Sequence, residues 1–103
     1  MVTKIQNNDM TDVEKSGLAV VDFSAAWCGP CKMLAPVFHE LAEEMEGIDF
    51  YSADVDENQD LAEKYGIRGV PTVLVLQNGV QADRSVGFQP KDKLRQFIEE
   101  QKN

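Results

Sequence analysis

The 103-residue chain is predicted to form an α/β domain, with a mixed central sheet of five strands flanked by four helices. Two observations support this prediction. Strand-like apolar runs alternate with segments of helical period, which is typical of parallel strands joined by helical crossovers. Asn78-Gly79 separates two further strand-like runs and indicates a tight antiparallel hairpin. The expected order is therefore β-α-β-α-β-α-β-β-α, in one domain spanning residues 1–103.

The amino-terminal part of the chain is expected to supply an edge strand, a short helix and a buried strand. Residues 3–6 can form the edge strand, and residues 8–15 have the pattern of a helix with Asn7 or Asn8 as its N-cap. Residues 18–25 (LAVVDFSA) are almost continuously apolar, as in a strand that is covered on both faces.

A change to helical period follows at Cys28. Apolar side chains then recur at helical spacing, and charged side chains take the opposite face. We expect this helix to end near Gly47. Its inward positions would be Leu34, Val37, Phe38, Leu41 and Met45.

The carboxyl-terminal part is expected to alternate in the same way. The predicted strands are residues 48–55, 72–77 and 80–86. A short helix over residues 58–65 would take Asn58 as its cap, and a final helix would have Pro90 at its first position. The inward residues of the final helix would be Leu94, Phe97 and Ile98.

The composition is that of an ordinary globular protein, with 43% hydrophobic and 27% charged residues. The net charge of −8 disfavours binding to nucleic acid or to anionic membranes, because both repel an acidic surface. No apolar stretch is long enough to span a bilayer, and the first residues lack the pattern of a secretory signal. The default expectation is a cytoplasmic monomer.

Both cysteines lie in the segment Trp27-Cys28-Gly29-Pro30-Cys31, where the buried strand gives way to the helix. Structural disulfides are rare in the reducing cytoplasm, so this spacing favours a redox pair. A helix N-terminus stabilises an anion, and a thiol attacks only as the thiolate. We therefore predict that Cys28 is the nucleophile and that Cys31 resolves the mixed disulfide. Gly29 and Pro30 leave room for a substrate chain beside Cys28.

Two other functions compete with dithiol–disulfide exchange. A metal scaffold is disfavoured, because a zinc site needs three or four ligands and the chain adds one histidine, His39, to its two cysteines. His39 is expected on the solvated face of its helix. A non-enzymatic binding module would use the apolar rim of the site, with the thiols incidental. An assay of protein-disulfide reduction separates that module from an enzyme.

Two positions near the cysteines leave alternatives open. Asp22 interrupts the apolar run of the preceding strand. It lies either at a solvated strand position or buried with a raised pKa, where it could accept the proton of Cys31. Pro71 suits a strand start, and base rates favour a trans bond between Val70 and Pro71.

Together these residues resemble the thioredoxin family over nearly the whole chain. The matching segments are the Asp22 strand, WCGPCK at 27–32, Pro36, YGIRGVPT at 65–72, Asn78-Gly79 and Val86-Gly87. The resemblance implies the thioredoxin fold, with a sheet order of 1-3-2-4-5. It also implies a general protein-disulfide reductant that binds no cofactor or metal. Such a thiol-disulfide oxidoreductase acts on disulfide-bearing proteins and is recycled by a separate thioredoxin reductase, usually a flavoprotein fed by NADPH.

At the site, the resemblance implies a cis bond before Pro71 and a buried Asp22 behind Cys31 as proton acceptor. The implied docking surface comprises Trp27, Gly29, Pro30, Gly69, Val70, Pro71, Val86 and Gly87. Many bacterial relatives have a Trp where this chain has Ser24 and a Lys where it has Ser52. Without that cation we expect a higher Asp22 pKa than in those relatives.

Overall fold

The computed structural model describes residues 1–102, and its element order is the predicted one. The strands are β1 (Val2–Lys4), β2 (Leu18–Ser24), β3 (Asp49–Asp54), β4 (Thr72–Gln77) and β5 (Val80–Val86). The helices are α1 (Thr11–Lys15), α2 (Gly29–Glu44), α3 (Gln59–Lys64) and α4 (Lys91–Glu99). Both strands of the Asn-Gly hairpin have their predicted bounds. None of the helices in residues 1–102 is both long enough and apolar enough to cross a membrane.

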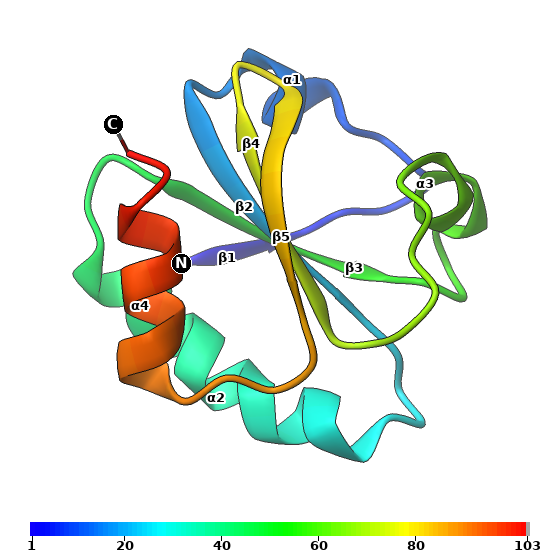
Figure 1. Cartoon of the computed structure of the whole chain (residues 1–103). Helices are drawn as coiled ribbons and strands as arrows, with labels where there is room; N and C mark the ends of the chain where they lie inside the picture. Colours follow the sequence, from blue (N-terminus) through cyan, green and yellow to red (C-terminus); the bar gives the residue numbers. More distant parts are fainter. Residues whose placement is uncertain (103) are drawn as a thin grey trace.

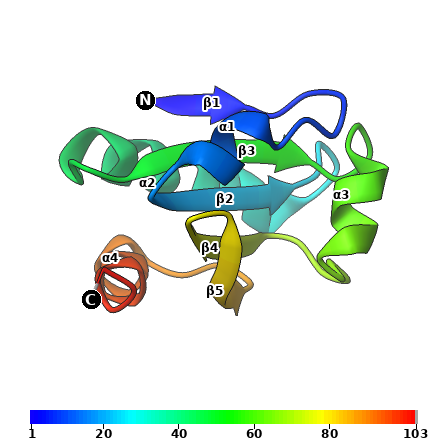
Figure 2. The ribbon, with the colours of Figure 1, turned by 90° about the horizontal axis from the view of Figure 1, so that it is seen from above.

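The five strands form one mixed sheet in the order β1-β3-β2-β4-β5, as implied by the resemblance (Figure 2). Strands β1 and β2 both pair in parallel with β3, because helical crossovers connect them. Strand β4 pairs antiparallel with β2 and with β5. The register places Asp22 of β2 beside Ser52 of β3 and Val73 of β4.

Each face of the sheet is covered by two helices, with α2 and α4 on one side and α1 and α3 on the other (Figure 1). Successive residues of β2 therefore enter different cores: Val20 packs with residues of α2 and α4, and Val21 with residues of α1 and α3. Both side chains are fully buried. This two-sided burial explains why β2 lacks the apolar–polar alternation of a half-exposed strand.

The start of α1 differs from the prediction. Neither Asn7 nor Asn8 is the N-cap; both have positive φ, at 55° and 56°, and α1 begins at Thr11. Asparagine is one of the few residues that tolerates this left-handed backbone, so the pair forms a turn. Asp9 takes the role of a local acceptor instead, because its Oδ1 receives hydrogen bonds from the backbone N and the Oγ1 of Thr11, at 3.0 and 2.6 Å.

The last helix also differs slightly from the prediction. Pro90 has an extended backbone and is the N-cap of α4, so Lys91 is the first helical residue. Leu94 and Ile98 are fully buried as expected, whereas Phe97 is only half-buried against the same core.

Candidate active site

Cys28 is the N-cap of α2, as its place between β2 and the helical pattern predicted. Its backbone is extended, with φ −95° and ψ 116°, and its Sγ accepts a hydrogen bond of 3.2 Å from the backbone N–H of Cys31. Pro30 lies in the first turn, where a missing N–H removes no helical hydrogen bond. The sulfur of Cys28 therefore occupies the position where unpaired backbone donors favour a negative charge.

Cys28 and Cys31 are joined by a disulfide, with their Cα atoms 5.3 Å apart. The two residues are only 5% and 4% exposed, and they pack with Ala25 and against Val55 and Val70. The predicted convergence of the two sulfurs is confirmed, and the structure is that of the oxidised pair.

The loop before β4 lies directly beside the disulfide. The Val70–Pro71 bond is cis, as the resemblance implied and against the base-rate expectation. The carbonyl oxygen of Val70 is 3.6 Å from the Sγ of Cys28. Two hydrogen bonds hold the loop: Thr72 Oγ1 donates to the Gly69 carbonyl at 2.6 Å, and Gly87 N–H donates to the Pro71 carbonyl at 2.8 Å.

Most of the expected docking residues form an area around Cys28 that is exposed except at the half-buried Val70, and we call it the front surface. Its members are Trp27, Gly29, Pro30, Gly69, Val70 and Val86. Trp27 is 70% exposed and Val86 61%, and a hollow of about 120 Å³ lies between Trp27 and the Gly69–Val70 backbone. Pro71 is buried and Gly87 half-buried, so these two residues support the front surface from beneath.

Trp27 is anchored by a residue that sequence reasoning missed. Its indole Nε1–H donates a 2.9 Å hydrogen bond to Oδ2 of Asp56, in the loop after β3. The two residues are 29 positions apart, and nothing in either local sequence indicates the contact.

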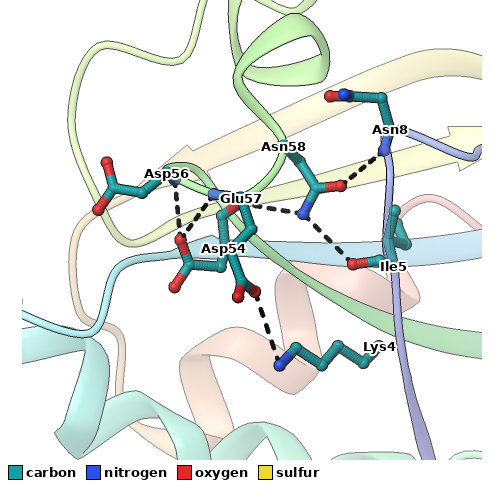
Figure 3. A network of polar contacts seen from close by, with 7 residues as sticks. All are labelled: Lys4, Ile5, Asn8, Asp54, Asp56, Glu57 and Asn58. Carbon is teal, nitrogen blue, oxygen red and sulfur yellow. Dashed lines mark hydrogen bonds and ion pairs between the residues drawn. The ribbon is translucent and has the colours of Figure 1, made fainter.

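The loop that carries Asp56 is itself fixed by a polar network, shown in Figure 3. Oδ1 of Asp54 accepts the backbone N–H groups of Asp56 and Glu57, at 2.8 and 3.2 Å. Asn58 is fully buried; it donates to the carbonyls of Ile5 and Asp54 and accepts the N–H of Asn8. Asn58 is the N-cap of α3 by position, but its side chain serves this network and makes no cap hydrogen bond.

Asp22 is buried, which decides between the two alternatives left open by the sequence. It is 4% exposed, and its Oδ1 has no hydrogen-bond partner among residues 1–102. Burial disfavours the charged form and raises the pKa of Asp22 from 3.8 to about 7.

A second hollow, of about 270 Å³ and partly open to solvent, is lined by Cys31 of the disulfide and by none of the front-surface residues. We call it the rear hollow. Its lining includes Asp22, Cys31, Ser24, Ser52 and His39. His39 is exposed as predicted, yet it also borders this space, which helical spacing alone did not indicate. In the described part of the chain, no three His, Cys, Asp or Glu side chains are grouped to hold a metal ion.

The comparisons with known proteins agree with this geometry. The thioredoxin family model matches residues 1–100. The chain is 44% identical over 99 residues to the thioredoxins of Staphylococcus aureus strains Mu50 and N315, and the match covers 95% of this chain and 95% of each relative. A solved structure of a mutant thioredoxin from Halobacterium salinarum NRC-1 superposes with a TM-score of 0.89 at 42% identity, covering 96% of this chain and 88% of that one.

Three observations lead to one conclusion: a helix-capping cysteine forms the Cys-Gly-Pro-Cys disulfide, the sheet has the order β1-β3-β2-β4-β5, and the similar proteins are thioredoxins. The chain belongs to the thioredoxin family and is a disulfide oxidoreductase that works by dithiol–disulfide exchange through Cys28 and Cys31.

Proposed function

We propose that the protein is a general reductant of protein disulfides, with Cys28 as the attacking and Cys31 as the resolving residue. The observation that carries this proposal is the place of Cys28 at the N-cap of α2, where its sulfur already accepts the Cys31 N–H. A thiolate in this place gains the hydrogen bond and the favourable helix dipole. Cys31, in the first turn, lacks the capping position.

In the first step, the Cys28 thiolate attacks one sulfur of a substrate disulfide. The substrate S–S bond breaks, the second substrate sulfur leaves as a thiolate, and a mixed disulfide joins Cys28 to the substrate. We propose that the front surface receives the substrate chain, with the Val70 backbone beside the reacting sulfur. The 3.6 Å between the Val70 carbonyl and the Cys28 Sγ supports this placement.

In the second step, Cys31 loses its proton and attacks the Sγ of Cys28. The bond between Cys28 and the substrate breaks, the substrate leaves with both sulfurs reduced, and the Cys28–Cys31 disulfide forms. We propose Asp22 as the acceptor of the Cys31 proton, because both residues line the rear hollow and the Asp22 pKa of about 7 suits proton exchange near neutral pH.

The oxidised protein must then be reduced again by a partner that supplies two electrons. Membership of the thioredoxin family implies disulfide-bearing protein substrates and a thioredoxin reductase. We propose that this reductase is a flavoprotein fed by NADPH and that the protein works as a cytoplasmic monomer without a bound cofactor. A reductant of disulfides acts in a compartment where thiols are kept reduced, which supports the cytoplasm.

Replacing the resolving cysteine tests the assignment of the two sulfurs. A Cys31→Ser variant should accumulate covalent complexes with disulfide-bearing proteins, because the second step has no thiol. Non-reducing gels and mass spectrometry of the linked peptides should find Cys28 at the junction. A Cys28→Ser variant is the matched control and should trap nothing. Equal trapping through Cys31 would overturn the assignment.

A further inference from the structure

The rear hollow contains a buried carboxyl group that the protein leaves unsatisfied. Only 4% of the surface of Asp22 is exposed, and its Oδ1 has no hydrogen-bond partner among residues 1–102. Nearly all buried polar atoms in proteins are paired, so an orphan of this kind needs an explanation. Oδ1 itself is closed to solvent, but another part of Asp22 lines the rear hollow, so a cation held there could neutralise the same carboxyl group.

We propose that the rear hollow is a binding site for a small primary ammonium ion, which pairs with Asp22 and is flanked by Ser24 and Ser52. The space of about 270 Å³ has room for such an ion. Ethylammonium has three heavy atoms and needs on the order of 90 Å³, taking about 30 Å³ for each water-sized group. An ammonium group supplies three N–H donors and no acceptor, which suits a carboxylate and two hydroxyls.

The register of the sheet explains why these groups meet. Asp22 on β2 and Ser52 on β3 are direct partners in a parallel pair, so their side chains leave the sheet on the same face. Ser24 lies two residues after Asp22 and therefore shares that face. All three line the hollow, and both serines are small enough to leave it open.

The charged groups around the hollow come from two elements. Lys32 and His39 of α2 border it, and Asp54 of β3 adds a second carboxylate. The other residues that line the hollow carry no charge, and neither does Val73 of β4, which lies beside Asp22 in the sheet. No ion pair links Lys32 to Asp22 or Asp54 in the part of the chain described. The protein's own cation thus leaves the carboxyl group of Asp22 unpaired.

An NMR titration of the oxidised protein tests the site, since neither cysteine titrates in that form. Ethylammonium chloride is added at pH 8 and constant ionic strength, with sodium chloride and tetramethylammonium chloride as the two comparison salts. We expect a saturable shift of the Asp22 carboxyl carbon and the Ser24 and Ser52 amides with ethylammonium alone, at about 1–100 mM. The same response to all three salts would mean charge screening only and would overturn the proposal.

Variants and pH sharpen this test. Asp22→Asn should weaken ethylammonium binding at least tenfold. Ser52→Val should weaken it too, because the larger side chain fills the space while the carboxyl group of Asp22 is kept. Glu40→Gln is the matched control, because Glu40 is an exposed carboxylate of α2 outside the hollow. Unchanged binding in Asp22→Asn and Ser52→Val would refute the site.

Binding should also depend on the charge of Asp22. If only the carboxylate binds, and its pKa is about 7, the apparent affinity should fall about a hundredfold from pH 8 to pH 5. Histidines change charge over this range, so the series is repeated with His39→Gln. An affinity that stays constant with pH in both proteins would contradict pairing with Asp22. None of these readouts depends on thiol exchange, so the outcome is independent of the proposed function.

Discussion

The disulfide has two unlike sides, the front surface and the rear hollow. The front surface is exposed and largely apolar, with Trp27 and Val86 most of the way into solvent. The rear hollow is lined by Asp22, Cys31 and two serines among others, and Asp22 is almost completely buried. The Cys28–Cys31 disulfide therefore lies beside a surface suited to binding a substrate chain and beside a space suited to holding or moving a proton.

The physical difference between the two sides is solvation. On the front surface, a substrate that covers an exposed apolar side chain such as Trp27 removes it from water. The hydrophobic effect therefore favours contact with a substrate there. At the rear, a carboxyl group has already lost its water, and the raised pKa of Asp22 follows from that loss. Changes on the two sides should consequently affect different measurements: substrate binding for the front, and protonation and stability for the rear.

The largest effect is expected at Cys28, the attacking residue of the disulfide pair. Cys28→Ser should lower the rate of protein-disulfide reduction by more than about a thousandfold, since a hydroxyl cannot replace the thiolate as nucleophile. Turnover with a disulfide-bearing protein and a reducing system is the measurement, and circular dichroism controls for folding. Activity within about tenfold of the parent protein would contradict the role of Cys28.

The rear hollow is probed by Asp22→Asn. We expect the second step to slow by about 10- to 100-fold at pH 7, at or below the lower end of what general base catalysis contributes, because water can still accept the proton, although less efficiently. Single-turnover release of substrate from a preformed mixed disulfide isolates this step. The attack by Cys28 on substrate should change much less, and equal loss in both steps would argue against a specific role for Asp22.

The same variant should stabilise the fold, with a defined pH dependence. The pKa of Asp22 is raised from 3.8 to about 7, so the folded state holds its proton while the unfolded state loses it. Stability should therefore fall as pH rises from about 4 to about 7, and the full penalty, up to about 4 kcal/mol, should be present above pH 7. Urea unfolding should show Asp22→Asn gaining stability at pH 8 and little at pH 3. A gain that is independent of pH would contradict this.

The smallest effect is expected on the front surface, at the Trp27 anchor. Asp56→Ala removes the acceptor of the indole N–H and should raise KM for a protein substrate about two- to fivefold, as expected for one lost surface hydrogen bond. Asp56→Asn keeps an acceptor oxygen and is the matched control. The fluorescence of Trp27, the only tryptophan, should report the change directly. A change in kcat without a change in KM would assign Asp56 to another role.

Much of the fold could be predicted from local sequence. The Asn-Gly turn fixed both strands of the hairpin, and the switch of period at Cys28 located the start of α2. The Asn7–Asn8 turn was missed, because asparagine favours both helix caps and left-handed turns and only tertiary contacts choose between them. The Asn8 side chain accepts the N–H of Leu61, 53 residues away, which no local pattern reveals.

The site was predictable where chemistry is local and unpredictable where it depends on register. Cys28 and Cys31 are three residues apart on one turn, so spacing alone brought them together. The burial of Asp22 depends on β2 lying between β3 and β4. The position of Ser52 beside Asp22 depends on the parallel pairing of β2 with β3, which a helical crossover connects. The Trp27–Asp56 bond depends in turn on the loop that Asp54 and Asn58 hold.

The central claim is that the N-terminus of α2 holds the Cys28 sulfur as a thiolate at neutral pH. The rate of alkylation of the reduced protein by iodoacetamide, followed against pH with each cysteine identified by mass spectrometry, measures this directly. We predict that Cys28 reacts first and with a pKa well below the ~8.5 of free cysteine. A Cys28 pKa at or above that value, or faster reaction at Cys31, would contradict the account.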